Sequence, residues 1–174
     1  MKNKNIFIIG PLGAGKTTVG RELARRAHLV FYDSDHEIEK KSGVSVATIF
    51  EFEGEDGFRK REQDMISNLT QLDNIVLSSG GGSILKRENR EAFASRGTVV
   101  YLRASLETQL ERTNQRKGTR PLLNTSDPFQ KIVELNAIRA PLYEEIANLI
   151  FNTDVDSPKT IADAIFEKVF ADRE

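Results

Sequence analysis

The sequence contains no cysteine. Disulfides, cysteine-ligated zinc sites and thiol nucleophiles are therefore excluded. It also lacks an excess of charge of one sign, because 25 Lys and Arg residues nearly balance 26 Asp and Glu residues and leave a formal net charge of −1. This balance gives no general attraction to nucleic acids or to membrane surfaces. Any basic site therefore has to be local and built from a few converging arginines.

Long apolar runs are absent as well. No run approaches the roughly 20 residues that a membrane-spanning helix needs, and the first apolar segment, Ile6–Ile9, is too short for the core of a signal peptide. With 39% apolar and 29% charged residues, the composition is typical of a soluble globular protein. We therefore expect a cytoplasmic monomer that binds neither nucleic acid nor membrane, and its 174 residues predict a single domain over 1–174.

Short apolar runs alternate with segments of helical spacing. The expected strands are residues 6–9, 29–32, 75–77, 98–102 and, more weakly, 149–151. Near-continuous apolar runs are typical of parallel strands that are covered on both faces. The expected helices include 17–27, 46–52, 58–72, 87–95, 105–113 and one that opens at Ser157, and Pro141 predicts a kink or a helix boundary. This alternation predicts a three-layer α/β fold that binds ligands beyond the carboxyl ends of its strands.

One long segment, about 114–125, has no clear periodicity. It is polar and basic and contains Arg116, Lys117, Gly118 and Arg120. Loops of this length in a compact domain are usually functional. We therefore expect a mobile lid over the ligand site.

The most specific motif runs from Gly10 to Thr17 and matches the phosphate-binding pattern G-x-x-x-x-G-K-[ST] between a strand and a helix. Glycines let successive backbone N–H groups point at phosphate oxygens, and the helix N-terminus adds partial positive charge. Lys16 is expected to bridge the β- and γ-phosphates, and the Thr17 hydroxyl to bind Mg²⁺. The predicted nucleotide-binding residues of this segment are Gly13, Ala14, Gly15, Lys16, Thr17 and Thr18.

Two aspartates follow the second expected strand, in the order Asp33-Ser34-Asp35. Near a phosphate loop, one can hold the metal, through a water molecule, and the other can accept a proton from an attacking hydroxyl. We assign the metal to Asp33. Either aspartate can instead cap the short helix that follows. No NKxD-type guanine-reading segment follows the later strands, which weakens the alternative of a GTPase.

A glycine triplet and four arginines complete the pattern. Gly80, Gly81 and Gly82 follow the third strand, where a glycine backbone can approach a ligand closely, although such a triplet can also be a flexible turn. The arginines are Arg59, Arg112, Arg120 and Arg139. Arginine binds carboxylate or phosphate with two donors at once. Taken singly, each arginine is better explained as a solvated surface charge, and Arg59 can simply pair with Glu62 along its helix.

Together these motifs resemble the shikimate kinase family. The matching segments are 10–17, 33–35, Gly54-Glu55 with Phe58-Arg59 and Glu62, 80–82, 120–123 and 139–143. They occur in the order of the family, and the resemblance spans nearly the whole chain. The resemblance implies a P-loop fold like that of nucleoside-monophosphate kinases, with a five-stranded parallel sheet in the order 2-3-1-4-5.

The resemblance also implies the reaction and the role of each residue. The reaction is transfer of the γ-phosphoryl group of ATP, with Mg²⁺, to the 3-hydroxyl of shikimate, a step of aromatic amino-acid biosynthesis. The implied shikimate-binding residues are Asp35, Arg59, Gly80, Gly81, Gly82 and Arg139. Arg112 and Asp154 fall near the adenine, and Arg120 falls on the lid, where it contacts ATP. The implied catalytic residues are Lys16, Asp35 and Arg120.

Two alternatives stay open at this point. Another small P-loop kinase, such as gluconate kinase, shares the phosphate loop and an acidic pair, but it does not require the set formed by Arg59, the glycine triplet and Arg139. A nucleotide-binding module without turnover would keep the fold. The presence of Lys16, Asp35 and Arg120 argues against that module, because a decayed enzyme often loses one of them.

Overall fold

A computed structural model describes residues 4–115 and 121–171. Its strands are β1 (Ile6–Ile9), β2 (Val30–Asp33), β3 (Ile75–Ser78), β4 (Thr98–Arg103) and β5 (Leu149–Asn152). They pair in parallel and form a five-stranded sheet in the order β2-β3-β1-β4-β5. The predicted fold class and strand order are therefore confirmed.

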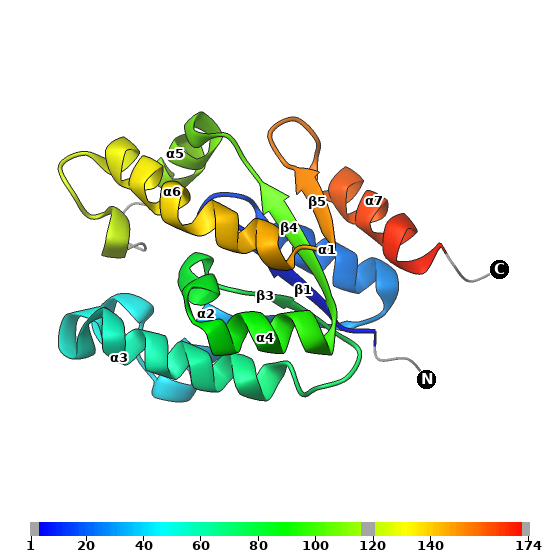
Figure 1. Cartoon of the computed structure of the whole chain (residues 1–174), viewed down its shortest axis with the longest axis horizontal. Helices are drawn as coiled ribbons and strands as arrows, with labels where there is room; N and C mark the ends of the chain where they lie inside the picture. Colours follow the sequence, from blue (N-terminus) through cyan, green and yellow to red (C-terminus); the bar gives the residue numbers. More distant parts are fainter. Residues whose placement is uncertain (1–3, 116–120, 172–174) are drawn as a thin grey trace.

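Helices cover both faces of the sheet and give three layers (Figure 1). Helices α1 (Lys16–Ala27) and α7 (Pro158–Phe170) pack on one face. Helices α3 (Val46–Leu69), α4 (Arg87–Arg96) and α6 (Pro128–Ile146) pack on the other. The remaining elements are α2 (Ser34–Ser42), α5 (Leu106–Asn114) and two short 3₁₀ helices, η1 (Gly81–Leu85) and η2 (Pro121–Leu123).

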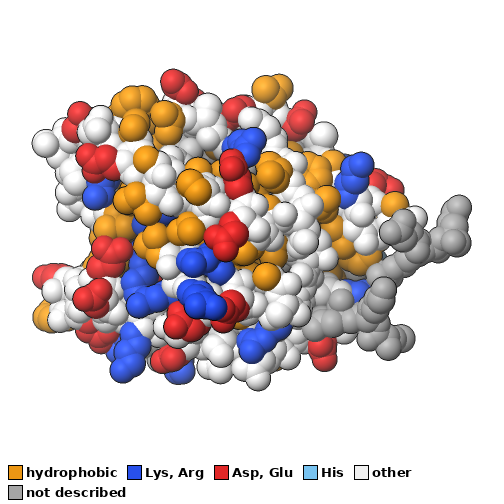
Figure 2. All heavy atoms as spheres, viewed as in Figure 1, with side chains coloured by type: hydrophobic (Ala, Val, Ile, Leu, Met, Phe, Trp, Pro, Cys, Tyr) orange, Lys and Arg blue, Asp and Glu red, His pale blue; other side chains and the backbone are white. Residues whose placement is uncertain are grey.

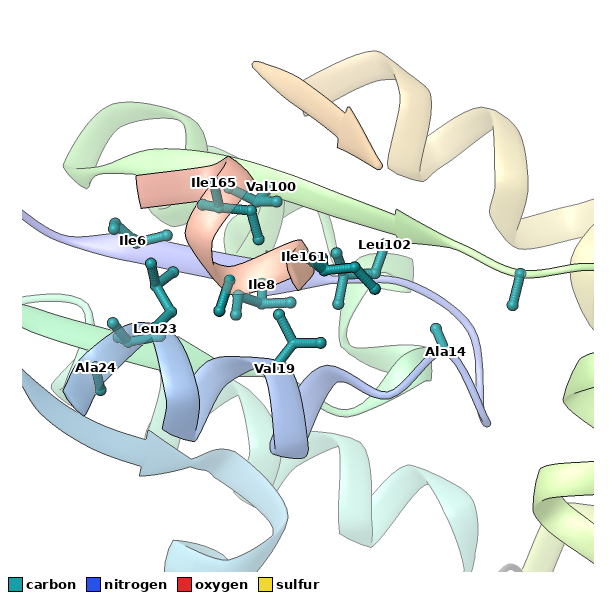
Figure 3. Close-up of a cluster of buried hydrophobic side chains, with 13 residues drawn as sticks. Ile6, Ile8, Ala14, Val19, Leu23, Ala24, Val100, Leu102, Ile161 and Ile165 are labelled. Atoms are coloured by element: carbon teal, nitrogen blue, oxygen red, sulfur yellow. The ribbon is translucent and has the colours of Figure 1, made fainter. Parts of the chain in front are cut away.

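Side-chain alternation along the central strand explains its unbroken apolar run. Ile6 and Ile8 of β1 point into the core beneath α1 and α7, where Leu23 and Ile165 meet them (Figure 3). The intervening residues of β1 belong to the core on the opposite face. Successive strand residues face opposite sides of a sheet, so a strand covered on both sides needs apolar residues at every position.

Serine residues are the N-caps of three helices, as their positions in the sequence predict. The hydroxyls of Ser45, Ser105 and Ser157 accept hydrogen bonds from backbone N–H groups three residues ahead, at 3.1, 3.2 and 3.2 Å. Each bond satisfies a donor that the first helical turn leaves open. These caps fix where α3, α5 and α7 begin, close to the bounds expected from the sequence.

Pro141 and Gly54 both lie inside helical elements. Of the two alternatives predicted at Pro141, a kink or a helix boundary, the boundary is wrong, because α6 continues through Pro141 to Ile146. Tertiary packing outweighs the missing donor, since Arg139 and Tyr143, on either side of the proline, are both buried. The two helices expected over 46–52 and 58–72 are present as the two parts of α3, which meet at Gly54, where the backbone is not helical (φ 71°, ψ −178°). A backbone with positive φ suits glycine because it has no Cβ.

The outer surface is mixed in charge. On the face shown in Figure 2, acidic and basic side chains are interspersed. Exposed ion pairs among the described residues include Arg87–Glu91 (2.7 Å) and Arg103–Glu144 (2.9 Å). Within residues 4–115 and 121–171, the structure contains no helix of the length and apolar character needed to span a membrane.

Candidate active site

A cavity of about 780 Å³ lies at the carboxyl ends of the strands. One part of its lining comes from the phosphate loop and the start of α1, and another from α2, α3, the glycine turn at 80–82 and α6. In Figure 1, α5 and α6 lie on one side of these strand ends and α2 and α3 on the other. The motifs that the sequence analysis singled out in the described residues converge here, at the edge of the sheet where α/β folds bind ligands.

Glycine is required at several points of the phosphate loop. Gly10, Gly13 and Gly15 have φ values of 149°, 78° and 85°, a region that L side chains rarely adopt. A Cβ on Gly10 would also lie 2.3 Å from the Leu102 carbonyl oxygen. The loop places all six predicted nucleotide-binding residues, 13–18, on the wall of the cavity. The Lys16 ammonium donates to the Pro11 carbonyl at 2.8 Å, across the mouth of the loop.

Asp33 caps helix α2 and also contacts the phosphate loop. One carboxylate oxygen accepts the Thr17 hydroxyl at 2.7 Å, and the other accepts the His36 backbone N–H at 3.1 Å and so caps α2. The cap therefore fixes the carboxylate beside the Thr17 hydroxyl and within the cavity lining.

This pair suits Mg²⁺, which prefers oxygen ligands and usually keeps several waters and substrate phosphates in its coordination sphere. The described part of the chain holds no group of three or more His, Cys, Asp or Glu residues that could bind a metal by themselves. The Thr17 hydroxyl and the Asp33 carboxylate would hold such an ion at this wall of the cavity.

Arg112 connects α5 to the phosphate loop. Its guanidinium donates to the Gly13 carbonyl at 3.0 Å and to the Thr153 carbonyl at 2.6 Å, and the Thr153 hydroxyl donates to the Ala14 carbonyl at 2.8 Å. Arg112 and Thr153 both line the cavity. The sequence did not predict that Thr153 supports the phosphate loop. Its position directly after the last strand was the only signal that could have indicated this role.

Asp154 faces a different neighbour. Its carboxylate accepts the Ser105 backbone N–H at 2.9 Å, and this bond holds the pKa of Asp154 below its usual value. Thr153 and Asp156 line the cavity, whereas the lining does not include Asp154. The adenine contact assigned to Asp154 stays a prediction.

The residues predicted to bind shikimate line a second part of the cavity, which we call the acceptor half. Asp35, Arg59, Gly80, Gly81, Gly82 and Arg139 all line it. The exposed fractions of Arg59 and Arg139 are only 6% and 4%, so the interpretation of these two arginines as solvated surface charges is wrong. Arginine is almost never buried without an anionic partner.

Glu62 is the partner that Arg59 has in this structure. Arg59 donates to Glu62 at 2.8 Å and to the half-exposed Glu55 at 3.3 Å. Glu62 has no exposed surface. Burial is the main cause that raises the pKa of Glu62 to about 7, Arg59 opposes the shift, and Asp35 adds to it. The site therefore contains closely coupled charges of both signs.

Arg139 of α6 completes this charged group. Its pKa is lowered, mainly by burial and also by the nearby charge of Arg59. Two buried guanidinium groups that repel one another are stabilised when an anion binds to both. The geometry therefore suits a substrate with a carboxylate.

The glycine triplet is required by space rather than by backbone conformation. None of Gly80, Gly81 and Gly82 has a positive φ. A Cβ on Gly80 would lie 2.8 Å from Glu62 Oε2 and 2.9 Å from Asp35 Oδ1, and one on Gly82 would lie 2.2 Å from Arg59 Nη2. Side chains at these positions would displace the charged groups of the acceptor half.

The predicted lid is only partly described. Its final part includes η2, and Pro121 and Leu122 line the cavity. Arg120, predicted as a catalytic and ATP-binding residue, lies outside the described residues, as do Arg116, Lys117 and Gly118. The role of Arg120 stays a prediction.

Comparisons with known proteins agree with this geometry. The family model for shikimate kinase matches residues 12–170. A shikimate kinase of Methylococcus capsulatus is 52% identical over 161 residues, 92% of this chain and 89% of that one. A shikimate kinase of Alteromonas mediterranea is 48% identical over 168 residues, 97% of this chain and 98% of that one.

Solved structures give the same result. The structure of shikimate kinase from Acinetobacter baumannii in complex with shikimate superimposes with a TM-score of 0.95 at 45% identity, covering 98% of this chain and 95% of that one. Shikimate kinase from Aquifex aeolicus superimposes with a TM-score of 0.80 at 32% identity, covering 96% of each chain.

Proposed function

The chain belongs to the shikimate kinase family and is an ATP-dependent kinase of shikimate, and we propose that the residues of the cavity divide the work of this reaction as follows. The observation that carries the proposal is the burial of Arg59 and Arg139 in the same cavity as the phosphate loop. One cavity can thereby hold a polyphosphate and a carboxylated acceptor at the same time.

The two arginines bind the carboxylate of shikimate. Each presents a planar fork whose donors match carboxylate geometry. Because both guanidinium groups are largely withdrawn from water, their interaction with an anion is screened little. Gly80, Gly81 and Gly82 approach the ring with their backbone, and Asp35, next to Gly80, orients its hydroxyls. This arrangement suits a carboxylated ring that carries hydroxyl groups, which favours shikimate over an open-chain acid such as gluconate or a purely nucleotide-binding role.

The phosphate loop binds ATP. Backbone N–H groups of residues 13–18 and the Lys16 ammonium contact the phosphates, and Arg112 lies at the adenine end of the loop. Thr17 and Asp33 would hold Mg²⁺, with Asp33 acting through a water molecule. The ion supplies charge neutralisation on the β- and γ-phosphates when it is bound.

Phosphoryl transfer forms one bond and breaks another. The 3-hydroxyl oxygen of shikimate attacks the γ-phosphorus, the bond from that phosphorus to the β–γ bridging oxygen breaks, and ADP leaves with the electron pair. Asp35 accepts the hydroxyl proton. Lys16, and Arg120 from the lid, stabilise the negative charge on the transferred group. An arginine in this position contributes about 10³–10⁵ in rate in other phosphoryl-transfer systems.

The remaining assignments are parts of the same proposal. The chain forms one domain over 1–174 in which segment 114–125 closes over the two substrates and excludes water. The position of Pro121 and Leu122 on the cavity wall supports a lid at this place. Action in the cytoplasm as a monomer stays a prediction.

A coupled assay of ADP release tests the assignment. Purified protein is incubated with ATP, Mg²⁺ and either shikimate or gluconate. Release that depends on shikimate is expected. Release with gluconate alone would show that the enzyme is another P-loop kinase, and no release with either acceptor would favour the binding module.

A further inference from the structure

A buried tyrosine connects helix α6 to the glycine turn of the acceptor site. Tyr143 has an exposed fraction of 1%, and its hydroxyl donates a 2.5 Å hydrogen bond to the backbone carbonyl of Gly81, 62 positions away in the sequence. Its ring packs against Tyr101 of β4, with 5.0 Å between the ring centroids. The ring thus belongs to the core, whereas the hydroxyl reaches the middle residue of the triplet that lines the cavity.

The hydroxyl is suited to this bond. Burial is the main cause that raises the pKa of Tyr143, so the phenol keeps its proton and remains a donor throughout the pH range in which enzymes work. A phenylalanine would fill the same space with almost the same apolar area. A buried hydroxyl has to find a partner, and the partner here belongs to the acceptor site.

The same helix carries the arginine that we assign to the carboxylate of the acceptor. Arg139 and Tyr143 are four residues apart on α6, so both side chains lie on one face and are separated by about 6 Å along the axis. The position that a Cβ on Gly81 would occupy is 3.5 Å from Arg139 Nη1 and 3.5 Å from the backbone N of Leu12 in the phosphate loop. The Gly81 backbone therefore lies between Arg139, the phosphate loop and the tyrosine hydroxyl.

We propose that Tyr143 is a positioning residue of the acceptor site, which sets the distance between the Arg139 guanidinium and the glycine turn through its hydrogen bond to Gly81. One turn of α6 supplies the anion-binding group, and the next turn holds the backbone that faces the same substrate. Without the bond, the turn at 80–82 can shift relative to Arg139, and the carboxylate and the ring can no longer be held together in a single geometry. Tyr143 does not contact the reacting atoms.

The inference rests on the proposed function, since it assumes that Arg139 and the glycine turn bind the acceptor. The test variant is Tyr143→Phe, which removes only the hydroxyl. We expect the KM for shikimate to rise about tenfold, as the loss of one well-placed hydrogen bond implies, with the KM for ATP unchanged within about twofold.

Tyr101→Phe is the matched control. It removes the hydroxyl from the other ring of the same aromatic pair, but the Tyr101 hydroxyl interacts with Arg103, and Tyr101 does not line the cavity. Both KM values of Tyr101→Phe should equal those of the wild type. An unchanged KM for shikimate in Tyr143→Phe would overturn the inference. So would an equal rise in both KM values together with a lowered melting temperature, because that pattern indicates loss of general stability.

The kinetics of Arg139→Ala and the hydrogen exchange of the wild type provide two further tests of the role of Tyr143. Arg139→Ala distinguishes it from the proposed function: an unchanged KM for shikimate in that variant would contradict the proposed function, whereas a raised KM there and an unchanged one in Tyr143→Phe would contradict only the role of Tyr143. If Tyr143→Phe does not fold, amide hydrogen exchange of the wild type decides. Shikimate should slow exchange in residues 80–85 and 139–146 together, and protection of one segment without the other would overturn the inference.

Discussion

Arg59 donates a 2.8 Å hydrogen bond to Glu62, a carboxyl group with no surface exposed to solvent. The pair lines the same cavity as Asp35 and Arg139, and both of these residues are close enough to influence the Glu62 carboxyl. Removing two ions from water is costly unless each is well paired. Here the cost is visible in the Glu62 carboxyl, whose pKa is raised to about 7 in spite of the arginine. The acceptor site thus costs stability before any substrate is bound.

A pH dependence of stability follows from Glu62. Its pKa is about 7 in the folded protein against an ordinary value of 4.5. Between these values, the unfolded chain has lost a proton that the folded protein still holds, so the free energy of unfolding falls as pH rises. Glu62→Gln cannot titrate and lacks this contribution. The melting temperature of the wild type, minus that of Glu62→Gln, should therefore fall between about pH 4.5 and pH 7 and change little above that. A difference that stays constant over this range would contradict the buried, proton-holding state of Glu62.

Arg139→Ala should separate the two substrates. A hydrogen bond to a charged group contributes about 1.5–3 kcal/mol, which corresponds to a rise of about 10- to 100-fold in the KM for shikimate, with little change in the KM for ATP. Steady-state kinetics with each substrate varied in turn measures both values. Arg103→Ala is the control, because it removes an arginine whose ion pair with Glu144 is exposed. Equal weakening of both substrates by Arg139→Ala would remove Arg139 from carboxylate binding.

Asp35→Asn should reduce turnover and leave nucleotide binding intact. The amide can still orient a hydroxyl but cannot accept its proton, and general base catalysis contributes about 10²–10⁴ in rate. We expect kcat to fall within that range while the affinity for ATP, measured by calorimetry, stays unchanged. Asp56→Asn makes the same chemical change at an exposed position of α3 and should behave as the wild type. Unchanged turnover in Asp35→Asn would eliminate Asp35 as the proton acceptor.

Substitution of Thr17 tests the metal site. Thr17→Val keeps the shape of the side chain but loses the hydroxyl that faces Asp33, whereas Thr17→Ser keeps the hydroxyl. The Mg²⁺ concentration that gives half-maximal activity should rise at least about tenfold in Thr17→Val and remain near the wild-type value in Thr17→Ser. Calorimetric titration of ATP with and without Mg²⁺ should show that the metal no longer strengthens nucleotide binding to Thr17→Val. A normal Mg²⁺ response in that variant would contradict the assignment.

The phosphate loop was largely predictable, because the residues that form it are consecutive in the sequence. The segment from Gly10 to Thr17 carries its own loop conformation, helix start and phosphate donors, and the structure places it as expected. Strand positions were also predictable, because strands covered on both faces require unbroken apolar runs such as Ile6–Ile9. The strand order came from the family resemblance.

The acceptor half was harder, because it is assembled from segments far apart in sequence. Nothing local shows that Arg59 and Arg139 are buried, and by themselves they look like surface charges. The pairing of Arg59 with Glu62 was foreseen as a helix contact, but its burial, and hence the raised pKa of Glu62, depends on elements that pack around it. The hydrogen bond from Tyr143 to Gly81 joins residues that are 62 positions apart, and no spacing rule predicts such a contact. Pro141 was misleading for the same reason, since the packing of α6 decides where that helix ends.

An acceptor that lacks the negative charge shows whether Arg139 and Arg59 bind the carboxylate of shikimate. The measurement is the ratio of kcat/KM for shikimate to kcat/KM for its methyl ester, in the wild type and in Arg139→Ala. We expect the wild type to prefer shikimate by about 100-fold or more, as two charge-assisted contacts imply, and Arg139→Ala to lose most of this preference. The same ratio in both proteins would contradict carboxylate binding by these arginines.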